Sequence, residues 1–163
     1  SAEGVVYCPP SGLPSALIYL AFHRHAFRGL LDAAVAYAQT IGATEIILLG
    51  HHEGAHWILD YQNQHAATLP TRLAMIAARS TYLIDLPYET LIAANTQPLA
   101  DFYYKNNVIE QKAAQQRLAA SRRANRKTYQ QIGLTSASGV QAIEQERLFR
   151  RVKGWLNKTN PVQ

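Results

Sequence analysis

The sequence predicts a single α/β domain with a mainly parallel sheet flanked by helices. Amphipathic segments alternate with short, β-prone apolar runs along most of the 163 residues, as expected for parallel strands joined by helical crossovers. The apolar runs lack polar alternation, which is typical of strands covered on both faces. With 48% hydrophobic and 17% charged residues, and neither repeat nor linker, the chain favours one folded domain over residues 1–163.

The clearest helix and the strand after it lie in the first half of the chain. Apolar residues recur at three- and four-residue steps over 27–41, and Gly42 is expected to end this helix. The unbroken run 45–50 predicts a buried strand. A second helix is expected to begin at about His52.

Later segments continue the alternation to the end of the chain. Further strands are predicted over 73–78, 98–104 and 127–134. Helices are predicted over 88–94 and 108–125, and a final helix follows a loop at 136–139. Residues 26–158 therefore form the core of the domain. The first 25 residues fit the pattern less clearly, and we expect them to add one or two strands, over 5–8 and 16–22.

Charge and histidine are unevenly distributed along the chain. Residues 1–100 carry four basic and seven acidic side chains, whereas residues 101–163 carry twelve basic and four acidic ones, and the net charge is +5. All six histidines lie within the first 65 residues. The single cysteine, Cys8, cannot form an intrachain disulfide, so the fold depends on its packed core. No apolar run approaches the roughly 18 residues that a membrane span needs.

The amino terminus lacks the basic and apolar regions of a signal peptide. Such a beginning suits a processed mature chain, a trimmed chain or a fragment.

Residues 50–54 form the pattern G-x-Nu-x-G between a buried strand and a helix. Glycine at both ends of this turn allows the strand and the helix to approach closely. The central residue is then held in a strained backbone conformation at the end of the sheet. In this chain the central residue is His52.

Three stretches of the chain resemble a family of uncharacterised bacterial envelope proteins related to α/β-hydrolases, a domain of unknown function. They are residues 36–55, 98–103 and 129–156, and the resemblance covers roughly residues 30–158. It implies a reduced α/β-hydrolase-like three-layer sandwich. It also implies a periplasmic or envelope-associated location, with a cytoplasmic one as the alternative.

Compared with the catalytic triad of that fold, the chain lacks the expected residue at all three positions. His52 stands where active hydrolases carry serine, cysteine or aspartate. The acid position falls at 105–107, which contains no carboxylate, and no histidine follows His65 to occupy the base position near 135–141. We therefore expect no Ser-Asp-His catalysis. The first hypothesis is a non-catalytic structural or protein-interaction component of a bacterial envelope assembly.

A second hypothesis is a zinc-dependent or degenerate hydrolase. The segment from His52 spells HExxH, in which His52 and His56 would bind zinc and Glu53 would act as general base. His65 could supply a third ligand. Against this, the helix is only beginning at His52, and Gly54 weakens its first turn. We therefore expect no cofactor, with zinc as the alternative.

Two clusters of basic residues form a candidate interaction surface. They comprise Arg122, Arg123, Arg126, Lys127, Arg147, Arg150, Arg151 and Lys153. Nucleic-acid binding through these carboxyl-terminal helices is a weaker alternative, because aromatic residues for base stacking are not interleaved with the cations. We favour other protein chains as partners, in a complex or a homo-oligomer, with phospholipid headgroups as a further option. A shortened sheet would also expose an edge for a partner to cover.

Overall fold

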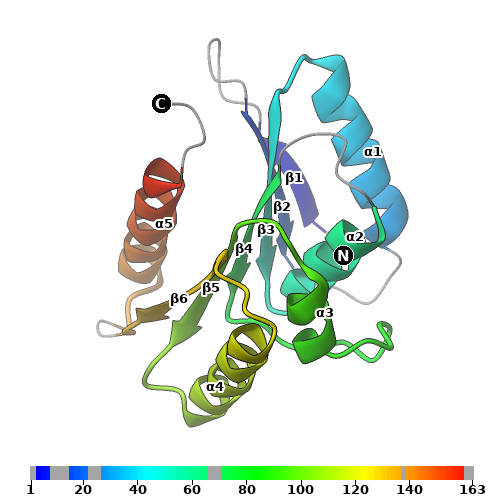
Figure 1. The fold of residues 1–163 in the computed structure, drawn as a ribbon. Coiled ribbons are helices and arrows are strands. Elements are labelled where there is room, and N and C mark those ends of the chain that lie inside the picture. Colours follow the sequence, from blue (N-terminus) through cyan, green and yellow to red (C-terminus); the bar gives the residue numbers. More distant parts are fainter. Residues whose placement is uncertain (1–2, 8–14, 22–26, 66–70, 137–138, 160–163) are drawn as a thin grey trace.

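In the computed structural model, the described residues are 3–7, 15–21, 27–65, 71–136 and 139–159. Six strands form one sheet, and their order in space follows their order in the chain (Figure 1). They are β1 (Glu3–Tyr7), β2 (Ser15–Ala21), β3 (Glu45–His51), β4 (Thr71–Ile76), β5 (Leu99–Tyr104) and β6 (Tyr129–Leu134). Strands β2 to β6 are parallel, and β1 pairs with β2 in the antiparallel direction. The predicted mainly parallel sheet is confirmed.

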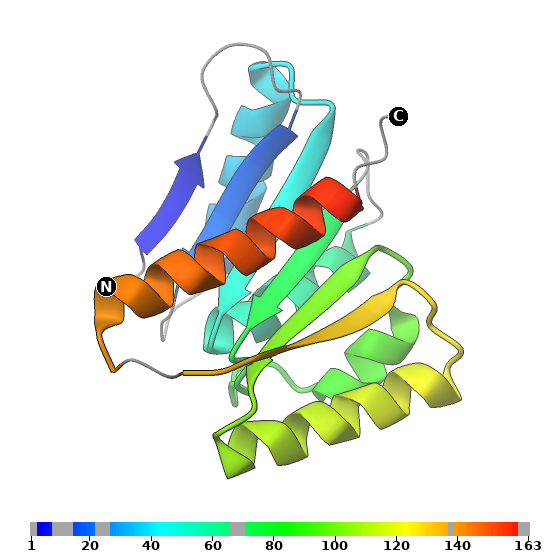
Figure 2. The same cartoon turned by 90° about the vertical axis from the view of Figure 1, so that its left-hand side faces the viewer.

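Helices cover both faces of this sheet. Those in the described part of the chain are α1 (Phe27–Thr40), α2 (Glu53–Gln64), α3 (Tyr88–Ala94), α4 (Val108–Arg123) and α5 (Gln141–Lys158). Helices α1, α2 and α3 lie on one face, α4 packs beside α3, and α5 crosses the opposite face (Figures 1 and 2). None of these helices is both long and apolar enough to cross a membrane.

The predicted elements differ from the observed ones mainly at their ends. Helix α3 matches its predicted bounds, and α2 begins one residue after His52. Strand β4 ends at Ile76, two residues earlier than predicted, because Ala77 has a positive φ of 47° and turns the chain out of the sheet. The predicted strands 5–8 and 16–22 correspond to β1 and β2, although Cys8 and Phe22 lie outside the described residues.

Strand β4 shows why the apolar runs lack polar alternation. Successive side chains of a strand point to opposite faces of the sheet. Leu73 and Met75 pack into the core beneath α2 and α3, whereas Ala74 and Ile76 pack into a second core under α5. Since both faces are buried, each residue of this strand is either apolar or has a polar partner, as Arg72 has in Glu45.

A buried ion pair fastens α5 to the sheet. Arg72 on β4 pairs with Glu45 on β3, and both side chains are buried. The same guanidinium donates through Nη1 to the Leu156 carbonyl at 2.7 Å and to Thr159 Oγ1 at 3.0 Å. A cation at the carboxyl end of a helix satisfies carbonyls that have no partner within the helix. The position of α5 on its face of the sheet is therefore set at its carboxyl end.

The turn between β3 and α2 requires glycine at its first position. A Cβ atom on Gly50 would lie 2.5 Å from the Gly54 carbonyl oxygen and 2.6 Å from the backbone of Ala55. These neighbours are backbone atoms, so no side chain can move aside. Gly50 therefore allows the helix to begin directly against the strand, as the G-x-Nu-x-G pattern predicts.

Replacing Gly50 with alanine should destabilise the fold. The added methyl group must displace the backbone of α2, so we expect the free energy of unfolding, measured in urea, to fall by about 1–3 kcal/mol. The matched control is Gly154→Ala on α5, where an added Cβ meets nothing within 4 Å. That change should stabilise the helix by about 0.5–1 kcal/mol. An unchanged urea midpoint for Gly50→Ala would contradict the close approach.

Candidate functional site

The candidate site lies where the parallel strands end. Strands β3, β4 and β5 end at His51, Ile76 and Tyr104, so the loops that follow them meet at one edge of the sheet. In open α/β sheets, ligands bind outside the carboxyl ends of the strands. The elbow follows β3, the expected acid position follows β5, and the expected base position follows β6.

His52 has the backbone conformation of a strained turn. Its backbone φ and ψ angles are 54° and −121°, a combination that residues other than glycine rarely adopt. Its N–H donates to the Ile76 carbonyl at 3.0 Å, and its carbonyl accepts from the N–H groups of Arg79 at 3.1 Å and Ala55 at 3.2 Å. Three segments thus hold the conformation, and His52 lies at the elbow that the sequence predicts.

The two histidines at the elbow are held in their neutral form. Their rings stack with centroids 3.9 Å apart. Burial, assisted by His52 and the Arg79 guanidinium, lowers the pKa of His51 to about 4, while Glu110 opposes the shift. Burial and Arg79 also lower the pKa of His52. The elbow therefore presents a neutral imidazole beside a cation.

The expected acid and base positions meet, but they hold neither group. Asn106 Nδ2 donates to the Ser136 carbonyl at 3.1 Å, which joins the loop after β5 to the loop after β6. Asn107 caps α4, because its Oδ1 accepts from the N–H groups of Ile109 and Glu110, both at 3.1 Å. These side chains join and cap backbone segments.

Glu110 provides a carboxylate that sequence reasoning missed at this edge. It lies in the first turn of α4, and its Oε2 accepts from the Tyr104 N–H at 3.0 Å. The spacing from Asn107 to Glu110 resembles a capping box, in which a carboxylate three residues after the cap reaches back along the chain. That signal could have indicated both the helix start and the direction of the carboxylate.

The HExxH segment holds a loop in place. The His56 side chain is buried, with 1% of the residue exposed, and its Nδ1 accepts from the Thr81 N–H at 3.0 Å. Its Nε2 donates to the Leu86 carbonyl at 2.8 Å. Burial lowers the pKa of this ring. Both nitrogens of His56 are therefore already engaged with the loop between β4 and α3.

The other proposed zinc ligands are not brought together with His56. His52 precedes α2, Glu53 is its first residue, and His65 Nδ1 contacts the Tyr61 carbonyl at 2.9 Å. Among the residues that the structure describes, no three His, Cys, Asp or Glu side chains are grouped to hold a metal ion. The zinc hypothesis thus gains no support from this geometry.

The two basic clusters lie on different layers of the fold. One is at the carboxyl end of α4, and the other runs along α5 on the opposite face (Figure 2). Three of their arginines have partners: Arg126 donates to the Ala93 carbonyl at 2.6 Å, Arg151 donates to the Gly133 carbonyl at 3.4 Å, and Arg150 pairs with Glu146. Within the described part of the chain, the exposed members without a contact of this kind are Arg122, Arg123, Lys127, Arg147 and Lys153.

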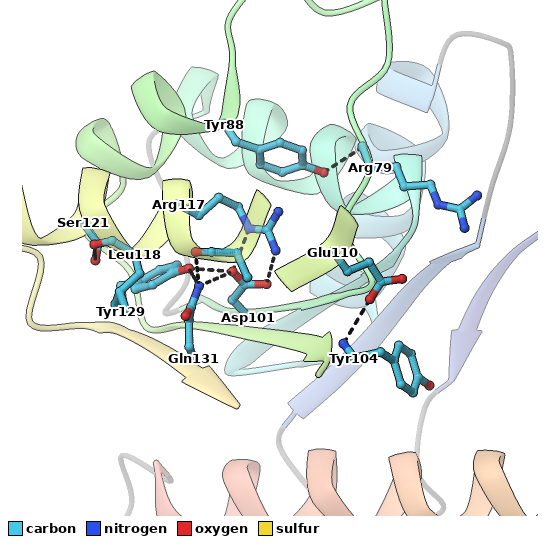
Figure 3. A network of polar contacts seen from close by, with 11 residues as sticks. Arg79, Tyr88, Asp101, Tyr104, Glu110, Arg117, Leu118, Ser121, Tyr129 and Gln131 are labelled. Atoms are coloured by element: carbon cyan, nitrogen blue, oxygen red, sulfur yellow. Dashed lines mark hydrogen bonds and ion pairs between the residues drawn. The ribbon is translucent and has the colours of Figure 1, made fainter. Parts of the chain in front are cut away.

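A buried polar network lies beside the elbow (Figure 3). Arg117 donates through Nε and Nη2 to the two oxygens of Asp101, at 2.7 and 3.0 Å. Tyr129 and Gln131 also donate to Asp101, at 2.5 and 3.2 Å. Burial of the Tyr129 side chain and the charge on Asp101 raise the pKa of Tyr129, so its hydroxyl remains a donor. The sequence signal that could have indicated this network is Asp101, the single acidic residue within the otherwise apolar and aromatic strand β5.

Two hollows open at this edge of the molecule. One, of about 390 Å³, lies between residues 78–80, the start of α3 and the first half of α4. The other, of about 600 Å³, is wider and lies over the loops that contain Asn106 and Ser136. Glu110 borders both hollows. The carboxyl edge therefore offers space for a ligand next to the elbow.

The chain matches DUF3530, a family described as "Protein of unknown function", over residues 20–158, and it belongs to this family. Comparison with curated proteins gives no match. Solved structures with a similar fold include a predicted CIB-like hydrolase from Thermoplasma acidophilum, with a TM-score of 0.55 and 9% identity. They also include LpqC, a poly(3-hydroxybutyrate) depolymerase from Bordetella parapertussis, with a TM-score of 0.51 and 14% identity.

These similarities establish an α/β-hydrolase-like fold. The matches cover 77% and 80% of this chain but only 56% and 59% of the two hydrolase structures. The chain thus spans less than two thirds of either relative. At this level of identity the likeness concerns the fold, which agrees with the three-layer sandwich that the resemblance implies.

The low histidine pKa values should make the fold sensitive to acid. The unfolded chain binds protons at the ordinary histidine pKa of 6.5, whereas the folded rings of His51 and His56 resist protonation. The free energy of unfolding should therefore fall as the pH drops from about 6.5 toward about 4. Denaturant titrations at several pH values measure this loss, and His51→Asn should reduce it. An equal loss in the variant and the wild type would contradict the assignment.

Proposed function

We propose that this protein is a non-catalytic member of the α/β-hydrolase-like proteins that acts as a structural or protein-interaction component of a bacterial envelope assembly. One observation carries the absence of catalysis: the elbow keeps its backbone but holds His52, and the two loops that would bring the acid and the base are joined through Asn106 and Ser136. A nucleophile activated by a neighbouring base needs both groups within hydrogen-bond reach. The described residues at this edge offer no such pair.

The exposed half of α5 supports a role in association. Phe149 and Ile143 expose 66% and 42% of their surfaces, and the exposed cations Arg147 and Lys153 lie on the same helix. Exposed aromatic residues and arginines are enriched in protein interfaces. We propose that this part of α5 contacts another protein chain.

The sheet edge offers a second surface for association. Within the described strands, β1 pairs only with β2, so its other side presents backbone groups that another strand or loop can satisfy. The envelope setting is part of the proposal and rests on the family resemblance alone.

The protein should not hydrolyse esters or peptides. We expect no turnover of a panel of short-chain p-nitrophenyl esters and peptides, with or without added zinc, because the elbow lacks an activated nucleophile and His56 is fully engaged. The matched variants are His52→Ala and Glu53→Ala. Turnover that zinc stimulates and Glu53→Ala abolishes would favour the zinc hydrolase. Zinc-independent turnover lost in His52→Ala would show that the elbow is catalytic.

Association through α5 should depend on its exposed apolar residues. We expect light scattering to give a mass above the 18.1 kDa of one chain, or cross-linking in the native host to capture a defined complex. Ile143→Asp combined with Phe149→Asp should abolish it, because burying two new carboxylates is unfavourable. The control, Gln141→Asp with Gln145→Asp, adds the same charge to exposed positions of α5. A monomer that yields no cross-linked complex, or equal effects of both pairs, would count against the proposal.

A further inference from the structure

The hollow of about 390 Å³ beside the elbow is bordered by a hydrogen-bond donor that has no partner among the described residues. Arg117 forms part of its lining, and only 4% of the Arg117 side chain is exposed. Nε and Nη2 of this guanidinium bind Asp101, and its Cζ lies over the Tyr88 ring, 5.6 Å from the centroid. Among the described residues, Nη1 has no hydrogen-bond partner.

The free Nη1 donor faces the hollow. Nη1 is not one of the fully enclosed side-chain atoms that lack a hydrogen-bond partner in the described part of the chain. A nitrogen that is unpaired yet not enclosed must reach an accessible space, and the space that Arg117 lines is this hollow. Figure 3 shows Asp101 on one side of the Arg117 guanidinium and Glu110 and Arg79 beyond its other side, with the Arg79 side chain directed away from Arg117. A ligand acceptor in this space would form a charge-assisted hydrogen bond with Nη1.

Helix α4 provides the room in front of this donor. Glu110, Ala113 and Arg117 follow one another at steps of three and four residues, so they share one face of the helix. Because the middle residue is alanine, a gap remains between the carboxylate of Glu110 and the guanidinium of Arg117. A volume of about 390 Å³ is within the range of small-molecule sites.

The charges around the hollow are of both signs. Arg79 contributes a cation for which no described residue provides an ion pair, and it is exposed beside the elbow. Glu89 and Glu110 contribute carboxylates, while the charge of Arg117 is balanced by Asp101. The carboxylates of Glu89 and Glu110 would repel a multiply charged anion. A simple amine would provide no acceptor for the arginine donors.

From this arrangement we infer that the hollow binds a small zwitterion that carries both a carboxylate and an ammonium group, as in a free amino acid or a dipeptide. The ligand carboxylate accepts from Arg117 Nη1, and the Arg79 cation at the border of the hollow attracts it. The ligand ammonium lies toward Glu89 and Glu110. Ala78, Ala113 and Ile109 provide apolar contacts for the remainder of the molecule. This inference does not depend on the proposed lack of catalysis, since binding needs neither a nucleophile nor a base.

Calorimetry on the full chain tests the ligand class. The twenty amino acids and a set of dipeptides are first screened by thermal shift at up to about 10 mM, and the best ligand is then compared with its deaminated and decarboxylated analogues. We expect each analogue to bind about tenfold more weakly or worse, since each loses a charge-assisted interaction. No binding within the screen, or an analogue or inorganic phosphate that binds as tightly, would overturn the inference.

Variants locate the binding in this hollow. Arg79→Gln changes an exposed side chain, so the fold should persist, and we expect it to weaken binding about tenfold. Arg117→Lys retains a cation for Asp101 but removes the forked donor, and it should weaken binding by at least as much. Lys112→Gln is the matched control, at an exposed position of the same helix that does not border the hollow, and it should leave the affinity unchanged. Unaltered affinity in Arg79→Gln would overturn the assignment even if Arg117→Lys fails to fold.

Discussion

The close approach of β3 and α2 at Gly50 is the constraint on which the carboxyl edge of the sheet depends. Since α2 begins against the strand, the chain must reverse within His52, and the positive φ of that residue follows. A conformation of this kind costs about 1–3 kcal/mol. The cost is offset by bonds from His52 to Ile76, Arg79 and Ala55, which also determine how the loop after β4 leaves the sheet.

The elbow can therefore be a structural element without being a catalytic one. Its hydrogen bonds use the backbone of His52, so they do not require a particular side chain at that position. The neighbouring loops also have a structural role that needs no catalytic group. Asn106 and Asn107 bind backbone groups there and hold the end of β5 to the loop after β6 and to α4. An edge built in this way retains its shape whether or not it carries a triad.

The sequence predicts the parts of the molecule that depend on local chemistry. The periodicity over 27–41, the apolar run in β4 and the two glycines of the elbow each act within a few residues, so the sheet, the helices and the place of His52 could be predicted. The contacts of the site could not. His56 binds a loop 25 and 30 residues away in the chain, and Arg117 meets Asp101 only once α4 has packed on β5. The HExxH pattern looked like a metal site because a short motif cannot show which partners the fold supplies.

The buried arginines show how the fold places charge without exposing it. Arg72 is satisfied by Glu45 and by the end of α5, so its donors serve the fold. Arg117 differs, because Asp101 engages two of its nitrogens and the third is left toward a hollow. Burying a charged group is unfavourable unless its hydrogen bonds are made. The ion pair with Asp101 offsets the cost of burying Arg117. The Nη1 donor that remains can bind a ligand, whereas the Nη1 donors of Arg72 only hold α5 to the sheet.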